Sequence, residues 1–205
     1  RGSEVGQEFR NRVGYLPEER GLYKKMKLLE VILFFAELKG VKGDEVKQKA
    51  LDYLEKFELL DRKDSKIEDL SKGNQQKVQF IIALLNDPDL LILDEPFTGL
   101  DPINQLLLKE IIQEKAQAGK TIIFSTHQME QVERLCSNIS LINKGKIILE
   151  GELRAVKDSK KTKAIEVVFD GKVDIEKVEN YLENVIVKEN FVSGIVKKDH
   201  RSFLN

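Results

Sequence analysis

Two adjacent carboxylates, Asp94 and Glu95, follow directly on four apolar residues, Leu90–Leu93. The apolar run lies between Pro88 and Pro96, so it is short and predicts a buried strand of a parallel sheet. The carboxyl ends of such strands are where open α/β sheets bind ligands. Because two neighbouring acids are costly to bury unless their charge is used, we expect a functional site here. Binding of Mg²⁺ together with a phosphate is one such use.

Further polar groups lie at the boundaries of other expected elements. The apolar segment Thr121–Ser125 predicts a second buried strand, and His127 follows its carboxyl end. Ser71 is a favourable N-cap for one helix, and Asp101 followed by Pro102 begins another. The amino end of a helix offers free N–H groups and a positive dipole end to an anion. The pattern therefore predicts carboxylates, an imidazole and an anion-binding helix end in one α/β domain.

The remaining elements of the first part of the chain are mostly helical. A short strand over Val13–Leu16 ends at Pro17. Helical spacing of apolar residues follows over 26–38, and Asp44 is the expected N-cap of the next helix. Successive helices without an intervening strand predict a helical subdomain inserted into the α/β core.

The last part of the chain has a different composition. Asn143–Lys146 predicts a hairpin turn between two strands, and the composition changes near Gly151. We interpret Lys157–Lys163 as a polar linker. Beyond the linker, a strand, a helix and two short strands are expected over 164–169, 174–182, 185–187 and 191–196, which together form a small α+β appendage.

In this order and spacing the motifs closely resemble the ATP-binding subunits of ABC transporters. They comprise Ser71–Gln75, Leu90–Glu95, Gly99–Asp101 and Ser125–His127. The segment Gly14–Tyr23, together with Lys72 and the appendage, resembles the branch that contains sodium-extrusion and other ABC-2-type exporters.

The resemblance implies a fold class and a division of the chain. We expect an α/β fold: a truncated P-loop NTPase (RecA-like) core with an inserted helical subdomain and a small C-terminal α+β appendage. The amino-terminal portion of the core, with a Q-loop-like segment, is expected over 1–24, and the helical subdomain with the signature motif over 25–85. The core with the Walker B, D-loop and H-loop motifs is expected over 86–150, and the accessory domain over 151–205.

The resemblance also implies roles, with ATP and Mg²⁺ as cofactors. Asp94 and Glu18 would hold the metal ion, Glu95 would act as general base on the attacking water, and His127 would contact the γ-phosphate. The residues expected to contact a nucleotide bound mainly by a second subunit are Ser71, Lys72, Gly73, Asn74, Gln75 and Asp101. Glu18 replaces the family's usual glutamine and, when ionised, donates no hydrogen bond. Lys72 replaces the commoner glycine and adds a positive charge near the phosphates.

The phosphate-binding loop of this family, G-x-x-x-x-G-K-[ST], has no counterpart in the 205 residues. Its only partial match is Gly119-Lys120-Thr121, where the motif's first glycine would fall on Glu114. This match also ends a helix and begins a strand, which is the reverse of the required order. We therefore interpret the chain as lacking the family's amino-terminal phosphate loop, and we expect it to hydrolyse no ATP by itself.

The composition limits partners and location. The net charge of −1 argues against nucleic-acid binding driven by bulk charge, and the single Cys136 excludes an internal disulfide. No apolar run approaches the roughly 20 residues of a membrane span. We expect a cytoplasmic chain held at the inner face of the membrane by a permease subunit, with a second ATP-binding subunit in a homo- or heterodimer.

Other interpretations stay open at this point. The alternative function is a soluble ABC-type ATPase that acts on ribosomes or DNA. A third interpretation makes the appendage alone a dimerisation or regulatory module without chemistry. Taken singly, Asp94 and Glu95 are compatible with a pair that caps a neighbouring helix, and His127 with a packed or surface histidine.

Overall fold

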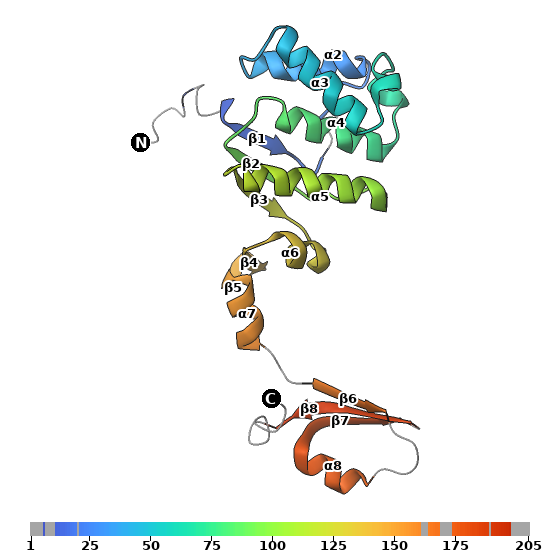
Figure 1. The fold of residues 1–205 in the computed structure, drawn as a ribbon, viewed down its shortest axis with the longest axis vertical. Helices are drawn as coiled ribbons and strands as arrows, with labels where there is room; N and C mark the ends of the chain where they lie inside the picture. The colour runs from blue at the N-terminus through green and yellow to red at the C-terminus, as the bar shows by residue number, and fades with distance from the viewer. Residues whose placement is uncertain are drawn as a thin grey trace. The chain divides into compact units, whose positions relative to one another are not determined.

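The computed structural model describes Gly6 and residues 11–19, 21–160, 164–168, 174–188 and 190–197. It contains two compact units, Arg1–Leu135 and Cys136–Asn205, and each is described by itself (Figure 1). The division into four parts that the sequence suggests stays a prediction.

A parallel sheet forms the centre of the first unit. Its strands β1 (Val13–Leu16), β2 (Leu90–Asp94) and β3 (Thr121–Ser125) lie in the order β1-β2-β3, with Val13 opposite Leu90 and Leu90 opposite Thr121. Leu91 and Leu93 of β2 are buried, which confirms the strand predicted from the apolar run. Because the strands are parallel, their carboxyl ends meet at one edge of the sheet.

Two helices pack against this sheet, and each begins at a loop beside β2. Helix α4 (Lys72–Leu84) contacts β1, and α5 (Pro102–Gln117) contacts β3 (Figure 1). Both predicted N-caps are confirmed: Ser71 Oγ accepts from the amide of Asn74 at 3.2 Å, and Asp101 Oδ1 accepts from the amide of Asn104 at 3.0 Å. The caps fix where each helix begins, at the loops that precede and follow β2.

A helical layer covers the other side of α4. It contains α2 (Leu28–Leu38), α3 (Asp44–Lys56) and the 3₁₀ helices η1 (Leu60–Arg62) and η2 (Ile67–Asp69). Phe57 and Phe80 join α3 and α4 with an edge-to-face contact of 6.1 Å between ring centroids, and both are fully buried. The predicted cap Asp44 is wrong by one position: Gly43 is the N-cap, at φ +108°, a value that glycine adopts readily.

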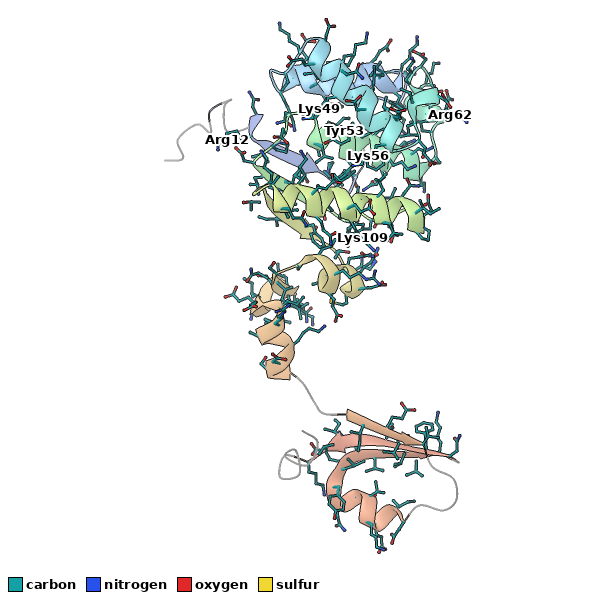
Figure 2. The ribbon with its side chains drawn as sticks, viewed as in Figure 1. Arg12, Lys49, Tyr53, Lys56, Arg62 and Lys109 are labelled. Atoms are coloured by element: carbon teal, nitrogen blue, oxygen red, sulfur yellow. The ribbon has the colours of Figure 1, made fainter. Side chains whose placement is uncertain are left out.

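A network of ion pairs links the amino ends of the strands. Asp87 and Asp89 lie in the loop before β2. Lys115 of α5 lies 2.6 Å from Asp87, and Arg12, labelled in Figure 2 beside β1, lies 2.6 Å from Asp89. Lys120 lies 3.1 Å from each acid. The network thereby joins β1, α5 and the start of β3 through one short loop.

The first unit ends with α6 (Met129–Leu135), and the second begins with the predicted hairpin. Strands β4 (Asn138–Asn143) and β5 (Lys146–Glu152) are antiparallel, and Lys144 and Gly145 at the turn have positive φ values. The linker predicted over 157–163 is wrong in its described part, because α7 (Leu153–Lys160) extends through Lys157. Residues 161–163 lie outside the described part of the chain.

The rest of the second unit is the predicted α+β appendage. Strands β6 (Ala164–Val168), β7 (Leu182–Lys188) and β8 (Phe191–Val196) form an antiparallel sheet in the order β6-β8-β7. Helix α8 (Ile175–Tyr181) lies between β6 and β7 in sequence and contacts β7.

Among the helices that the structure describes, none combines the length and the apolar character needed to cross a membrane.

Candidate active site

The side chains of Glu95 and His127 meet at the carboxyl edge of the parallel sheet. His127 Nδ1 lies 2.7 Å from Oε1 of Glu95, and the His127 backbone amide donates to the same oxygen at 2.9 Å. The hydroxyl of Thr126 lies 3.2 Å from Oε2, and that of Thr98 lies 3.5 Å from it. Both carboxylate oxygens are therefore held by groups from the β3 end and from the turn after β2.

The backbone around Glu95 explains why this carboxylate turns toward β3. Glu95 has φ +42°, in the left-handed region that non-glycine residues seldom adopt. Its amide donates to the carbonyl of Ser125 at 3.0 Å, which extends the β2–β3 pairing by one residue. Its carbonyl accepts from the amide of Thr98 at 3.1 Å, closing a tight turn. The turn thus redirects the chain directly after the strand and aims Glu95 along the sheet edge.

Asp94 is the last residue of β2, and its Oδ1 accepts a short hydrogen bond from the hydroxyl of the facing Ser125. Oxygen donors of this kind suit Mg²⁺, which usually takes one or two protein carboxylates and fills its other positions with water and phosphate oxygens. Within the described residues, no three acidic, histidine or cysteine side chains gather in a way that could hold a metal. Asp94 therefore fits one ligand of such an ion.

A second polar cluster surrounds the amino end of α4. Ser71 and Lys72 are exposed there, and Gly73 packs so closely on the next loop that an added Cβ would lie 2.6 Å from the carbonyl oxygen of Gly99. Asp101 is exposed in the same loop, and its pKa lies below the usual value because the backbone and side chain of Asn104 donate to it. This cluster offers an exposed helix end and a lysine to an anion.

Two predicted nucleotide-binding residues also have structural roles here. The backbone amide of Asn74 bonds to the Ser71 cap. The side-chain amide of Gln75 donates to the carbonyls of Ile67 at 3.1 Å and Leu70 at 3.0 Å, so it secures the turn before α4. Their contacts with a nucleotide stay predictions, as do those of the other residues of this cluster.

Glu18 belongs to neither cluster. It is exposed in the loop that follows β1, where the Gln79 side chain donates to the carbonyl of the neighbouring Glu19 at 3.4 Å. The predicted metal contact of Glu18 therefore stays a prediction that this arrangement does not test.

One residue near Glu95 was not predicted. Gln76 of α4 is 2% exposed, and its Nε2 lies 3.5 Å from the carbonyl oxygens of both Glu95 and Pro96. A signal for it was available, because Gln76 lies one helical turn before the buried Phe80. A polar residue on a core-facing stripe requires a buried partner.

The sequence is similar to ATP-binding proteins of ABC transporters. A family model described as "ABC transporter" matches residues 2–98. The ABC transporter ATP-binding protein MJ1023 of Methanocaldococcus jannaschii is 45% identical over 95% of this chain and 73% of its own length. YhaQ of Bacillus subtilis, another ABC transporter ATP-binding protein, is 48% identical over 78% of this chain and 53% of its own. The chain thus spans about half of that relative.

A third relative carries a transport direction in its name. The Nod factor export ATP-binding protein I of Cupriavidus metallidurans is 38% identical over 74% of this chain and 50% of its own length.

Two solved structures share the fold. The ATP-binding subunit of an ABC transporter aligns with a TM-score of 0.70 and 32% identity over 75% of this chain and 64% of that one. The ATP-binding cassette MJ0796, solved as a dimer in a post-hydrolysis state with ADP and Pi, aligns with a TM-score of 0.65 and 25% identity over 72% and 66%.

Proposed function

Because the chain belongs to the family of ABC transporter ATP-binding proteins, we propose that it is part of a subunit whose ATP hydrolysis energises a membrane exporter. The observation that carries the proposal is the contact of Glu95 with His127 at the sheet edge, beside Asp94. The exporter direction is supported by the export protein among the relatives.

Each side chain of this edge has a separate task in the proposal. Asp94 would hold Mg²⁺, which would neutralise charge on the phosphates. Glu95 orients the attacking water and accepts its proton. His127 contacts the γ-phosphate through Nε2, since Nδ1 faces Glu95. An imidazole that bonds to Glu95 at one nitrogen and to the γ-phosphate at the other fixes the position of the base relative to the phosphate.

The amino end of α4 serves the nucleotide of a second subunit in this proposal. Ser71, Lys72 and Gly73 face that nucleotide's phosphates, and Asp101 lies at the seam between the subunits. A head-to-tail pair has two-fold symmetry, so each copy lends this surface to the other. The dimeric state of the similar cassette MJ0796 supports the pairing. Glu18 and the helical subdomain expected over 25–85 would transmit the conformational change that accompanies hydrolysis to a permease subunit at the inner face of the membrane.

The phosphate-binding pattern G-x-x-x-x-G-K-[ST] is absent from the 205 residues. Its backbone amides and lysine hold the β- and γ-phosphates in P-loop enzymes. We therefore infer that this chain by itself hydrolyses no ATP, and that the protein made from the complete reading frame is the form to assay.

The deciding experiment compares three proteins: that from the complete reading frame, its Glu95→Gln variant, and the 205-residue chain. We expect ATP hydrolysis in the first alone. Affinity purification should recover an integral membrane subunit, whereas recovery of ribosomes or DNA would favour the alternative of a soluble ABC-type ATPase. Hydrolysis that survives Glu95→Gln undiminished would refute the proposed site, and hydrolysis by the 205-residue chain would refute the statement on that chain.

A further inference from the structure

The buried amide of Gln76 connects the two polar clusters of the site. Its nitrogen lies 3.5 Å from the Glu95 carbonyl and 3.5 Å from the Pro96 carbonyl, and the residue is only 2% exposed. Water therefore has little access to replace these hydrogen bonds, and a buried donor without a partner is unfavourable. The Gln76 side chain therefore stays hydrogen-bonded to the backbone directly after β2.

The backbone conformation at Glu95, with φ +42°, is unfavourable for a non-glycine residue and persists only where surrounding contacts stabilise it. The Glu95 carbonyl accepts from the Thr98 amide at 3.1 Å within the turn and from Gln76 on the side of α4. These two donors fix the peptide plane that follows Glu95. The plane in turn sets the direction in which the Glu95 side chain leaves the backbone.

The same turn touches α4 a second time. Gly73, one helical turn before Gln76, packs against the carbonyl of Gly99 with room for no side chain between them. Gln105 of α5 holds the far side of the turn through the Leu100 carbonyl at 3.1 Å. The first turns of α4 therefore contact the Glu95–Leu100 turn both at its start and near its end.

We infer that Gln76 is a positioning residue: it holds the backbone of Glu95 and fastens it to the amino-terminal turn of α4. The inference rests on the proposed function for the roles of Glu95 and Ser71. Since Ser71, Gly73 and Gln76 share the start of one helix, a displacement of this helix end by a partner's nucleotide reaches Glu95 through two hydrogen bonds. The base Glu95 of one ATP site is thereby coupled to the amino end of α4, which contacts the nucleotide of the second subunit's site.

The first test uses the protein from the complete reading frame. Gln76→Glu keeps the shape of the side chain but, when ionised, places oxygens against two carbonyl oxygens. Gln76→Ala removes the donor. Both should lower kcat about tenfold or more, while KM for ATP changes less than about twofold, because the base and not the nucleotide is displaced. Gln48→Ala is the control, since Gln48 is exposed and donates within α3 to Asp52 at 2.8 Å.

The second test needs no activity and uses the 205-residue chain. Amide hydrogen exchange at Thr98 should become about fivefold faster or more in Gln76→Ala, because the turn closed by the Glu95 carbonyl loosens. Exchange at Asn104, whose amide bonds to Asp101, and at the buried Ile111 should stay within about twofold of the unchanged chain.

The outcomes separate this inference from the function it rests on. Absence of ATP hydrolysis in the unchanged protein would refute the proposed function, and the exchange at Thr98 would then decide the role of Gln76 alone. An unchanged kcat in Gln76→Ala, an unchanged exchange rate at Thr98, or an equal acceleration at Thr98 and Ile111 would each overturn the inference.

Discussion

The imidazole of His127 and the carboxylate of Glu95 are directly joined, with Nδ1 2.7 Å from Oε1. Their side chains differ sharply in exposure, 77% for His127 and 16% for Glu95. With Nδ1 facing Glu95, Nε2 is the nitrogen available to a ligand, and it donates to a phosphate oxygen when it too carries a proton. The carboxylate is therefore held inside the site, while the ring remains open to whatever binds at the sheet edge.

The first prediction concerns Glu95→Gln, which preserves the size of the side chain and removes its charge. In the protein from the complete reading frame we expect kcat to fall about 100-fold or more, because an amide cannot accept the proton of the attacking water. ATP binding should persist within about threefold, since the proposed phosphate contacts lie elsewhere. Steady-state hydrolysis and equilibrium nucleotide binding measure the two quantities. A parallel loss of both would show that Glu95 serves binding rather than chemistry.

The second prediction concerns His127→Ala. Removal of the ring deletes the contact of Nδ1 with Oε1, while the His127 backbone amide still donates to that oxygen, and it deletes the group open to the ligand. We therefore expect kcat to fall about 100-fold. The change should leave thermal unfolding within about 2 °C, because the ring is largely exposed. His200→Ala is the matched control, since His200 is the other of the chain's two histidines. Equal losses in both variants would contradict a specific role for His127.

Local signals predicted the elements that carry the site. The bounded run before Asp94 indicated β2, and the caps Ser71 and Asp101 were found because side chains of their type satisfy free amides at a helix start. The two proline-bounded ends of β2 made its limits visible. The match to ATP-binding cassettes confirms the fold class inferred from these motifs.

Contacts between distant residues were not predictable in the same way. Glu95 and His127 are 32 residues apart, and only the parallel pairing of β2 with β3 brings them together. Most residues of α4 from Gln76 onward are buried, so the amphipathic pattern that usually separates core from surface is lost and Gln76 was overlooked. Lys157 was assigned to a linker because lysines favoured an exposed chain, although an exposed helix such as α7 satisfies the same pattern.

The third prediction concerns Gly14→Ala in β1. A Cβ at this position would lie 2.6 Å from Cδ2 of Leu91 and would overlap the carbonyl oxygen of Ala83. Because a backbone group of α4 cannot move aside without displacing the helix, we expect the free energy of unfolding to fall by roughly 1–3 kcal/mol. Urea unfolding of the 205-residue chain measures the change. Gly21→Ala is the control, since nothing lies within 4 Å of its added Cβ.

That control should change the free energy of unfolding by no more than about 0.5 kcal/mol. Equal stabilities of the Gly14 and Gly21 variants would show that β1 and α4 are not packed as closely as the structure has them.

The fourth prediction concerns the ion pairs of Asp87, which accepts from Lys115 at 2.6 Å. This hydrogen bond is the main cause that holds the pKa of Asp87 below its usual value, and the bond from Lys120 lowers it further. A carboxyl group with a depressed folded-state pKa stabilises the fold at pH values above its unfolded-state pKa of about 3.9. It loses that contribution as the pH falls through the folded-state pKa. Asp87→Asn should therefore lower the free energy of unfolding at neutral pH and leave it unchanged in strong acid.

At pH 7 and low salt we expect Asp87→Asn to lower the free energy of unfolding by about 1 kcal/mol, because its side chain is half exposed and solvent screens the pairs. The difference should shrink progressively below about pH 4, and about 1 M salt should reduce it at pH 7. Asp64→Asn, an exposed acid in the loop between η1 and η2, removes the same charge and should change little. Urea unfolding from pH 7 to about pH 2.5 measures both variants. A difference that stays constant with pH, or that grows on acidification, would show that Asp87 acts through the backbone of its loop and not through its charge.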